Sequence, residues 1–275
     1  LACMPAALDV NSNTFQNVER NMLVVETTGP MICDNTCLDG LHGIEVRDCN
    51  GSHVERNAVR MATGCAITLL RCADSVAAHN KLTSVGTGVL VNDCAGVQVL
   101  GNAVSHAMQN GIRCIQTVAG PDVKDLTVRI VDNVVSDSSN TGILCDLPAY
   151  SNTEISNNTI SSAEGTGICI QCAEDDAGAV QQEVQHHAHL HVVANAIQEC
   201  KIGLQFLCLV WNCSVTDNVI SHSRTHGVVV HEGAYDLTLQ YNTVSLSHGT
   251  GVVLFGGDAD VAHAEISLFS NAVRE

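Results

Sequence analysis

The chain has 275 residues, of which 45% are hydrophobic and 15% charged, a composition typical of a protein whose side chains mostly line one continuous core. Its formal net charge is −17 and its only lysines are Lys81, Lys124 and Lys201. We therefore expect no binding to nucleic acid or to an anionic membrane surface, because a row of phosphates would meet no matching positive charge. No apolar run reaches the length of a transmembrane helix, so we expect no membrane span.

A short repeat recurs along the whole chain. In each copy an asparagine is followed two residues later by an apolar residue, and successive asparagines are mostly 22 to 25 residues apart. The repeat asparagines are Asn13, Asn35, Asn57, Asn80, Asn102, Asn133, Asn158, Asn195, Asn218, Asn242 and Asn271. Longer steps precede Asn133, Asn195 and Asn271. We interpret these as insertions at the corners of a stacked repeat, near residues 115–127, 172–187 and 255–263.

A glycine follows most of these asparagines after seven to nine residues. These glycines are Gly43, Gly64, Gly88, Gly111, Gly142, Gly167, Gly203, Gly227 and Gly251. The first and third residues after the glycine are apolar, as in Ile44 and Val46 or Val228 and Val230. Alternation with a period of two, in bursts too short for a helical pattern, predicts short β-strands separated by corners.

Three short strands per repeat cannot bury their inner faces alone, so we expect the repeats to stack. Each coil would pair with the next as parallel strands about 4.8 Å away, which gives a rod on the order of 50 Å long. The sequence thus predicts an all-β solenoid of about 10–11 coils with three short strands per coil. We expect residues 1–275 to form one domain, and we interpret the chain, which begins at Leu1 without Met, as part of a longer protein.

The repeat asparagines are suited to corners of such a solenoid. Asparagine tolerates the left-handed backbone conformation better than most residues, and its side-chain amide can hydrogen-bond to the asparagine of the next coil. We therefore predict that the eleven asparagines form a continuous ladder along one edge of the rod.

An N-x-V motif followed by G-I-x-V at this spacing resembles the right-handed parallel β-helix repeat. That repeat is found in pectate-lyase-like proteins, NosD-like periplasmic proteins, alginate epimerases and F-box-associated β-helix domains. The resemblance covers essentially the whole chain and implies a right-handed parallel β-helix. It implies little about activity, because the motif consists of core and corner residues that every member of the fold needs.

The chain contains 14 cysteines. Inward strand positions are assigned to Cys37, Cys65, Cys114, Cys145 and Cys213, and corner positions to Cys49, Cys94 and, close to them, Cys72. Equivalent positions on adjacent coils are about 4.8 Å apart, which exceeds the usual Cβ separation in a disulfide, so we expect mostly free thiols. Free thiols favour a reducing intracellular compartment.

A histidine-rich segment, residues 186–191, is a candidate metal site. By register with Asn195, the side chains of His187, His189 and His191 project outward from one strand, and Glu154 occupies the position equivalent to His191 in the preceding coil. Imidazoles at two-residue spacing on one face can chelate a transition metal, which is the one candidate cofactor. The alternative is a solvated strand face that is rich in histidine.

A second candidate, for catalysis, is His231 with Glu232 and Asp236, at the corner after the Gly227 strand. A carboxylate beside an outward imidazole could orient it for general acid or base chemistry. The alternative is an ordinary polar corner. The polysaccharide lyases and epimerases of this fold place carboxylates with a basic residue or tyrosine on an outer strand face, and their motifs are absent from this sequence.

The position two residues after each glycine should face solvent, yet it is often apolar. The apolar members of this outward stripe, including two at the next outward position, are Leu90, Leu144, Leu207, Val229, Val253 and Phe255. A contiguous apolar stripe on an outer face usually marks a covered surface, so we expect a protein partner or a neighbouring domain there. The alternative is burial of these side chains by the corner insertions.

The sequence therefore favours a rigid, acidic, non-catalytic β-helix scaffold that binds a partner through an outer sheet face. One alternative is a polysaccharide-active lyase, epimerase or hydrolase, with carbohydrate as its partner. Such an enzyme should have a basic or aromatic groove, whereas aromatic residues make up only 3% of this chain. A third hypothesis, implied by the resemblance to NosD-like proteins, is metal binding through the histidine segment.

Overall fold

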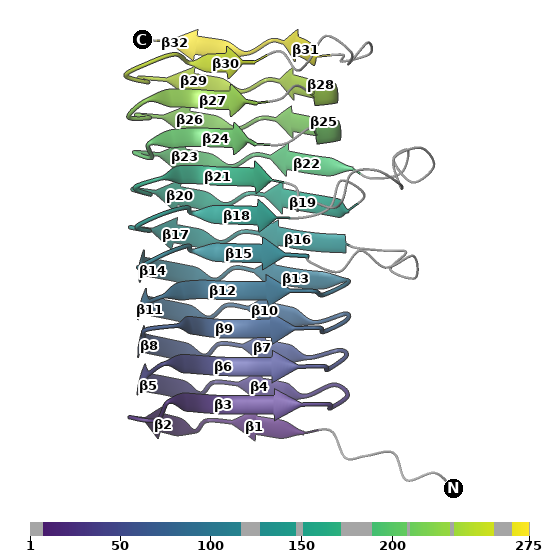
Figure 1. The fold of residues 1–275 in the computed structure, drawn as a ribbon, viewed down its shortest axis with the longest axis vertical. Coiled ribbons are helices and arrows are strands. Elements are labelled where there is room, and N and C mark those ends of the chain that lie inside the picture. Colours follow the sequence, from purple (N-terminus) through teal and green to yellow (C-terminus); the bar gives the residue numbers. More distant parts are fainter. Residues whose placement is uncertain are drawn as a thin grey trace, which may run out of the picture.

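The computed structural model describes residues 8–116, 127–146, 151–171, 189–207, 210–231, 234–255 and 266–274, with the backbone alone at 210–211, 234–236 and 266. Throughout these residues the chain winds as a right-handed coil of strands without helices (Figure 1). Each turn adds one strand to each of three parallel sheets, two of which have 11 strands and the third 10. The predicted parallel β-helix, with three strands per coil, is confirmed.

The first sheet, sheet A, begins each coil. It contains β1 (Asp9–Asn11), β4 (Met31–Cys33), β7 (His53–Glu55), β10 (Val76–Ala78), β13 (Val97–Leu100), β16 (Thr127–Val131), β19 (Asn152–Ser156), β22 (Leu190–Val193), β25 (Val210–Thr216), β28 (Ala234–Gln240) and β31 (Ile266–Phe269).

Sheet B follows after a sharp corner. It contains β2 (Thr14–Gln16), β5 (Thr36–Gly40), β8 (Ala58–Ala62), β11 (Lys81–Val85), β14 (Ala103–Ala107), β17 (Val134–Ser136), β20 (Thr159–Ser161), β23 (Ala196–Gln198), β26 (Val219–Ser221), β29 (Thr243–Ser245) and β32 (Ala272–Arg274).

Sheet C completes the coil and faces the viewer in Figure 1. It contains β3 (Arg20–Val25), β6 (His42–Arg47), β9 (Cys65–Leu70), β12 (Thr87–Asn92), β15 (Ile112–Ile115), β18 (Ile143–Asp146), β21 (Thr166–Gln171), β24 (Ile202–Phe206), β27 (His226–Val230) and β30 (Val252–Leu254).

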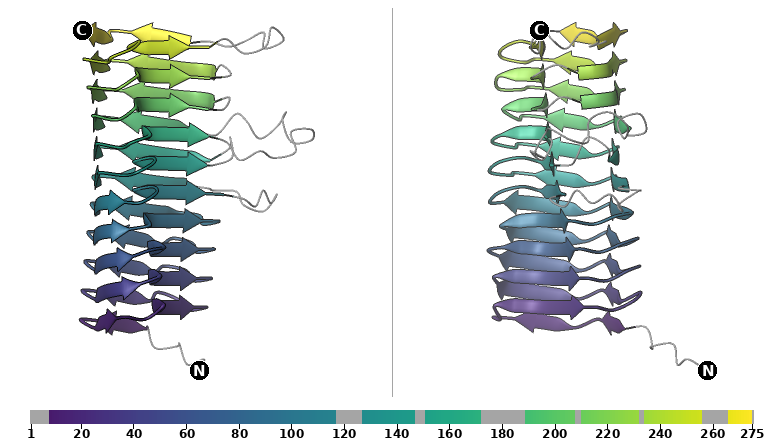
Figure 2. Two further views of the ribbon diagram at one scale, coloured as in Figure 1. Left: turned by 60° about the vertical axis from the view of Figure 1, so that its left-hand side comes forward. Right: turned by 45° about the vertical axis from the view of Figure 1, so that its right-hand side comes forward.

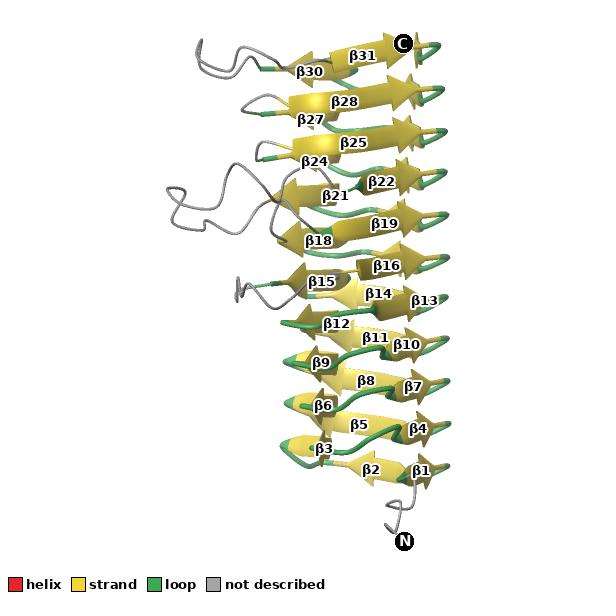
Figure 3. Cartoon of the chain, turned by 90° about the vertical axis from the view of Figure 1, so that its right-hand side faces the viewer, coloured by secondary structure: helices red, strands yellow, loops and turns green. Residues whose placement is uncertain are grey.

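Inward side chains from the three sheets form one hydrophobic core along the whole rod. Strand alternation directs every second residue inward, and most of these residues are valine, isoleucine, leucine or cysteine with almost no exposed surface, such as Ile67, Ile112 and Ile168. Figures 2 and 3 show the coils stacked directly on one another, which places each core residue next to its equivalents in the coils before and after it. Each layer of the core therefore contacts only the coils next to it, as in other repeat proteins.

The eleven repeat asparagines form a ladder between sheets A and B. The side chain of Asn102 illustrates the pattern: its Oδ1 accepts hydrogen bonds from the backbone N and Nδ2 of Asn80, and its Nδ2 donates to Ala77 O and Asn133 Oδ1, at 2.9–3.0 Å. Asn133 continues to Asn158 in the same way. From Asn35 to Asn242 the ladder asparagines are nearly inaccessible, and because each amide is hydrogen-bonded, this polar column is stable inside the corner.

The left-handed backbone conformation belongs to the residue before each ladder asparagine, and not to the asparagine itself as predicted. Ser12, Asp34, Arg56, His79, Gly101, Asp132, Asn157, Ala194, Asp217, Tyr241 and Ser270 have φ between +49° and +58°. The reason is that the exposed residue makes the bend, which leaves the asparagine free to turn its amide inward along the rod.

The glycines of sheet C are required by the close approach of the next coil. A Cβ on Gly88 would lie 2.3 Å from Gly111 O and 2.6 Å from Val104 Cγ1. The third coil departs from the prediction, because the pairing of Ile44 with Ile67 places Ala66, and not Gly64, in this column. Gly64 instead lies in the preceding corner.

The same two-residue offset between Gly64 and Ala66 changes the place of Cys65, which the sequence analysis assigns to an inward strand position. Ile67 and Leu69 are the fully buried inward residues at the centre of β9, whereas Cys65 is partly exposed at the start of the strand. The described part of the chain contains no helix long and apolar enough to cross a membrane.

Candidate functional site

The outer face of sheet C carries two columns of outward side chains, defined by the strand register. The first column is Leu23, Glu45, Thr68, Leu90, Arg113, Leu144, Cys169, Gln205, Val229 and Val253. The second, two residues further along each strand, includes Val25, Arg47, Leu70, Asn92, Ile115, Asp146 and Gln171, followed by Leu207, His231 and Phe255 just after their strands. Both columns run the length of the rod.

Several outward apolar side chains of the first column are buried. Leu144 is 8% exposed, Cys169 4% and Val229 3%, although their register directs them away from the core. Leu207 and Phe255, in contrast, are 37% and 50% exposed. In the C-terminal half of this face, the first column therefore holds buried apolar side chains, interrupted by Gln205, next to exposed apolar side chains of the second column. This differs from the uniformly exposed stripe that the alternation of the strands alone suggests.

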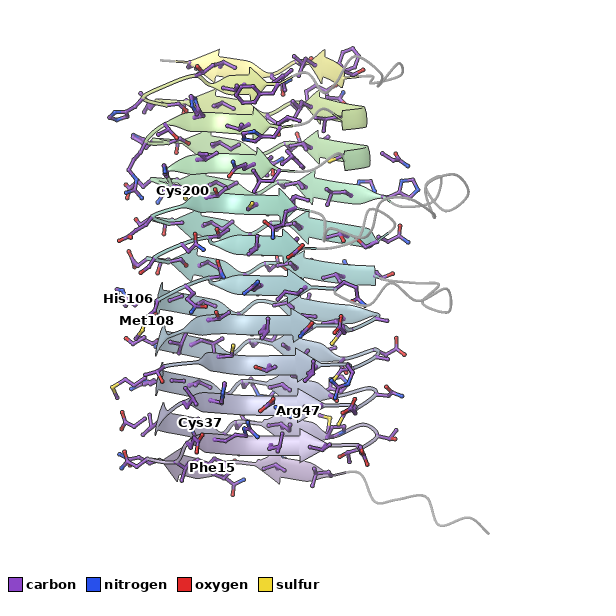
Figure 4. The ribbon with its side chains drawn as sticks, viewed as in Figure 1. Phe15, Cys37, Arg47, His106, Met108 and Cys200 are labelled. Carbon is purple, nitrogen blue, oxygen red and sulfur yellow. The ribbon has the colours of Figure 1, made fainter. Side chains whose placement is uncertain are left out.

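The N-terminal end of the same face is charged. The carboxylate of Glu45, which is 5% exposed, pairs with Arg20 at 3.0 Å and with Arg47. Figure 4 shows the position of Arg47. Both guanidinium groups remain partly in solvent, so the buried carboxylate is compensated from two sides. The first coil at this end also exposes two apolar side chains, Leu23 at 44% and Val25 at 43%.

His231 lies in the C-terminal half, in a chain of polar contacts that ends on an aromatic ring. Thr166 Oγ1 donates to Gln205 Oε1 at 2.9 Å, and Gln205 Nε2 lies 3.3 Å from His231 Nε2. The imidazole stacks on Phe255 with ring centroids 5.0 Å apart. An amide and a phenyl ring thus orient His231, and among the described side chains no carboxylate contacts it. Glu232 and the side chain of Asp236, its predicted partners, lie outside what the structure describes.

The histidine segment contributes two described imidazoles on sheet A. The rings of His189 and His191 stack with centroids 6.0 Å apart, and His189 Nδ1 lies 2.7 Å from Asn212 Nδ2. His191 pairs in register with Glu154, as the sequence predicts. His187 lies outside the described residues.

Glu154 is already engaged by other groups. Its carboxylate accepts hydrogen bonds from Arg129 Nε at 2.8 Å and Ser156 Oγ at 2.7 Å, and the Arg129 guanidinium holds the pKa of this carboxyl below its ordinary value. In the described ranges no three histidine, cysteine, aspartate or glutamate side chains are arranged to hold a metal ion. The described histidine set therefore does not fit a metal centre.

The corner between sheets C and A carries a column of thiols that the sequence analysis identified only in part. The pairing of Arg47 with Leu70 and of Leu70 with Asn92 makes Cys49, Cys72 and Cys94, two residues further on, equivalent in three consecutive coils. All three are at most 2% exposed. Their spacings of 23 and 22 residues match the asparagine repeat, and that signal assigns Cys72 to the same column.

Backbone groups surround these sulfurs. The N–H of Cys72 donates to Cys94 Sγ at 3.2 Å, and the N–H of Thr27 donates to Cys49 Sγ at 3.3 Å. The hydrogen bond from the Cys94 thiol lowers the pKa of Cys72 to about 7 and raises that of Cys94. The eleven cysteines of the described ranges are all free thiols, as expected.

Comparison with known proteins supports the fold more than any activity. Residues 6–120 match the family described as periplasmic copper-binding protein (NosD). A search of curated protein sequences finds no significant match.

Solved structures with the same architecture are distant in sequence. The receptor-binding tailspike of bacteriophage Det7 has a TM-score of 0.65 at 9% identity, covering 97% of this chain and 69% of its own. PfbA, a surface adhesin of Streptococcus pneumoniae, has 0.54 at 10%, covering 92% and 70%. The catalytic unit of an α-1,3-glucanase from Streptomyces thermodiastaticus has 0.53 at 10%, covering 96% and 64%.

At such low identity these structures show a shared fold alone, and the NosD match is confined to the N-terminal coils. The chain is a right-handed parallel β-helix repeat protein, the fold that these solved structures share.

Proposed function

We propose that this protein is a rigid, non-catalytic scaffold that binds a protein partner on the outer face of sheet C. The observation that carries the proposal is the position of the apolar side chains in the C-terminal half of that face. Leu207 and Phe255 are exposed beside the covered strip of Leu144, Cys169 and Val229. The two side chains flank His231 in the second column, and exposed apolar side chains gathered on one outer face of a monomer are typical of an interaction surface.

The described chemistry of this face favours binding over catalysis. A general acid and base require two titratable groups directed at one substrate position, whereas the nearest described partners of His231 are an amide and a phenyl ring. The ladder and the continuous core make the rod stiff, so a partner would meet a preformed surface with little ordering of the scaffold.

Two surface variants test the proposal. Leu207→Asp together with Phe255→Asp introduces charge where the patch is open, so it should weaken partner binding at least tenfold while leaving the circular dichroism spectrum unchanged. The matched control is Val219→Asp, because Val219 is 50% exposed on the outer face of sheet B. We would measure affinity by calorimetry with the partner purified on immobilised wild-type protein. Equal affinity for the wild type and the double variant would contradict the proposal.

A second candidate ligand is a neutral carbohydrate. The half-exposed ring of Phe255, beside the planar polar groups of Gln205 and His231, offers a sugar both a stacking surface and hydrogen-bonding groups. The net charge of −17 disfavours uronate polymers, because polyanions would be repelled. Titration with neutral and uronate oligosaccharides, using Phe255→Ala against the control Phe269→Ala, tests this. Conversion of any oligosaccharide would overturn the non-catalytic proposal.

The metal hypothesis receives no support from His189 and His191, the described histidines of the segment. The NosD match ends at residue 120, whereas His189 and His191 lie beyond it, and Glu154 is held by Arg129. Replacing His189 and His191 with Ala should leave any metal-induced thermal shift of the protein unchanged. Loss of such a shift in this variant would restore the hypothesis.

A further inference from the structure

Arg113 lies near the middle of the first outward column of sheet C and has no counter-ion among the described residues. At the N-terminal end of the same face, Arg20 and Arg47 both pair with Glu45, whereas no described carboxylate forms an ion pair with Arg113. The Nε–H of Arg113 is also buried without a hydrogen-bond acceptor. Buried donors without an acceptor are rare in native structures, so this one needs an explanation.

The two carboxylates in the outward columns of this face do not neutralise Arg113. Glu45 is already held by two other arginines. Asp146 lies on the next coil, in register with Ile115 and not with Arg113, and no ion pair joins it to the guanidinium. Arg113 as a whole is half-buried, so its guanidinium can still be reached from outside the sheet.

A second polar atom beside Arg113 also lacks a partner. Asn92 lies on the preceding coil, in register with Ile115, and its Oδ1 is buried without a donor in the part of the chain that the structure describes. The two atoms are complementary in kind, because one needs an acceptor and the other needs a donor. An acidic residue in a peptide supplies both, through its carboxylate and a backbone N–H.

The surroundings of Arg113 favour a carboxylate over a neutral acceptor. In the first column Arg113 lies between Leu90 and Leu144, and Ile115 occupies the second column of the same strand. An ion pair beside aliphatic groups is stronger than one in open water, because the local dielectric constant is lower. The planar guanidinium also holds a carboxylate by two parallel hydrogen bonds, which fix its orientation.

We propose that Arg113 binds an aspartate or glutamate side chain of the protein partner, an inference that rests on the proposed function of this face. The carboxylate accepts from Nε and one terminal nitrogen of Arg113 after a small rotation of the side chain. Three coils of about 4.8 Å each place the exposed Leu207 about 14 Å further along the rod, within reach of the same partner segment. The net charge of −17 repels a strongly acidic surface, so the segment is otherwise apolar or basic.

Two short peptides test the site without the natural partner. The probes are acetyl-Leu-Asp-Leu-amide and its Asn counterpart, titrated at constant ionic strength into the isotope-labelled chain. NMR follows the Nε–H signal of Arg113, which Arg113→Lys identifies because lysine has no guanidinium. The aspartyl peptide should shift this signal to saturation, whereas the asparaginyl peptide should leave it in place, because a neutral amide pairs only weakly with a guanidinium.

Glutamine variants measure the contribution of the guanidinium. Arg113→Gln should weaken binding of the aspartyl peptide at least tenfold, with an unchanged circular dichroism spectrum. The matched control is Arg60→Gln, because Arg60 is an exposed arginine on the outer face of sheet B, and this variant should bind as the wild type does. Equal responses of the Arg113 signal to the two peptides, or equal affinity of Arg113→Gln and the wild type, would overturn the inference.

Two further outcomes would also overturn it. If Asp146→Asn without peptide shifted the Arg113 signal as far as the aspartyl peptide does, Asp146 would be the counter-ion. Tighter binding of a uronate oligosaccharide than of the aspartyl peptide would assign the site to carbohydrate. The double variant with Leu207→Asp and Phe255→Asp should keep the peptide response, so this inference and the proposed function can fail separately.

Discussion

The coils from β1 to β12 and those from β15 onward share one core and differ most at the corner between sheets C and A. In the first region, only residues 48–52 separate β6 from β7, and the bend is made by Asp48 and Gly51, both with positive φ. In the second, residues 116–126 separate β15 from β16 and residues 172–189 separate β21 from β22. The corner between sheets A and B keeps the same two-residue form in both regions.

The difference shows which parts of the repeat can vary. The ladder and the inward residues contact equivalents in both neighbouring coils, so a change there propagates along the rod. The corner between sheets C and A contacts its neighbours mainly through short bridges, such as Asn50 with Ala73. Insertions there leave the pairing of the flanking strands intact, as in β13 with β16 and β19 with β22.

The largest expected effect comes from breaking the ladder, and it should be equal in the two regions. Asn57→Ala and Asn195→Ala each remove an amide that accepts two hydrogen bonds and donates two inside the corner. Each should lower the free energy of unfolding by about 3 kcal/mol, because the orphaned groups stay buried. Urea denaturation measures this. The exposed Asn13 is the control, with an expected loss below about 1 kcal/mol. A clear difference between the losses of unfolding free energy at Asn57 and Asn195 would show that the ladder does not stabilise the two regions equally.

The next effect concerns the close approach of coils in sheet C. Alanine at Gly88 or at Gly203 should lower the free energy of unfolding by about 2 kcal/mol, since the new Cβ would lie 2.3 Å from an atom of the next coil in each case. Ala66→Gly at the equivalent position of the third coil should cost less than about 1 kcal/mol, because it adds only backbone freedom. Thermal and urea unfolding measure these differences. If all three variants were as stable as the wild type, the close approach of the coils would not require glycine at these positions.

A smaller loss of stability is expected at the tight corner between sheets C and A, which is characteristic of the N-terminal coils. Gly51 has φ +66°, and a Cβ there would meet nothing closer than Gly29 Cα at 3.9 Å. Gly51→Ala should therefore cost about 1 kcal/mol through backbone strain alone, and Gly51→Asn should cost less. If Gly51→Ala and Gly51→Asn lowered the free energy of unfolding equally in denaturant titrations, steric crowding and not the positive φ would explain the loss.

The smallest effect lies on the surface ion pair of the C-terminal region. Arg129 lowers the pKa of Glu154, so this carboxylate contributes stability above its unfolded-state pKa and loses that contribution as the pH falls through the lower folded-state value. Because both side chains are more than one third exposed, Glu154→Gln should cost at most about 1 kcal/mol at pH 7 and nothing in strong acid. Glu19→Gln, at an exposed position without an ion pair to a described residue, is the control for unfolding measured against pH.

Local periodicity in the sequence was enough to determine the architecture. The recurrence of Asn35, Asn57 and Asn80 with an apolar residue two positions later encodes one corner and the strand after it, and a repeat that cannot bury its own face must stack. The ladder follows from the same spacing, because stacking brings equivalent residues within hydrogen-bonding distance.

Other features depended on neighbouring coils, which no single repeat reveals. The two-residue shift that puts Ala66 in the glycine column, the burial of Leu144 on an outer face and the contact of Gln205 with His231 all arise between strands far apart in sequence. The equivalence of Cys72 with Cys94 likewise required the register of sheet C. A repeat specifies which way a side chain points, but only the stacked coils decide what it meets.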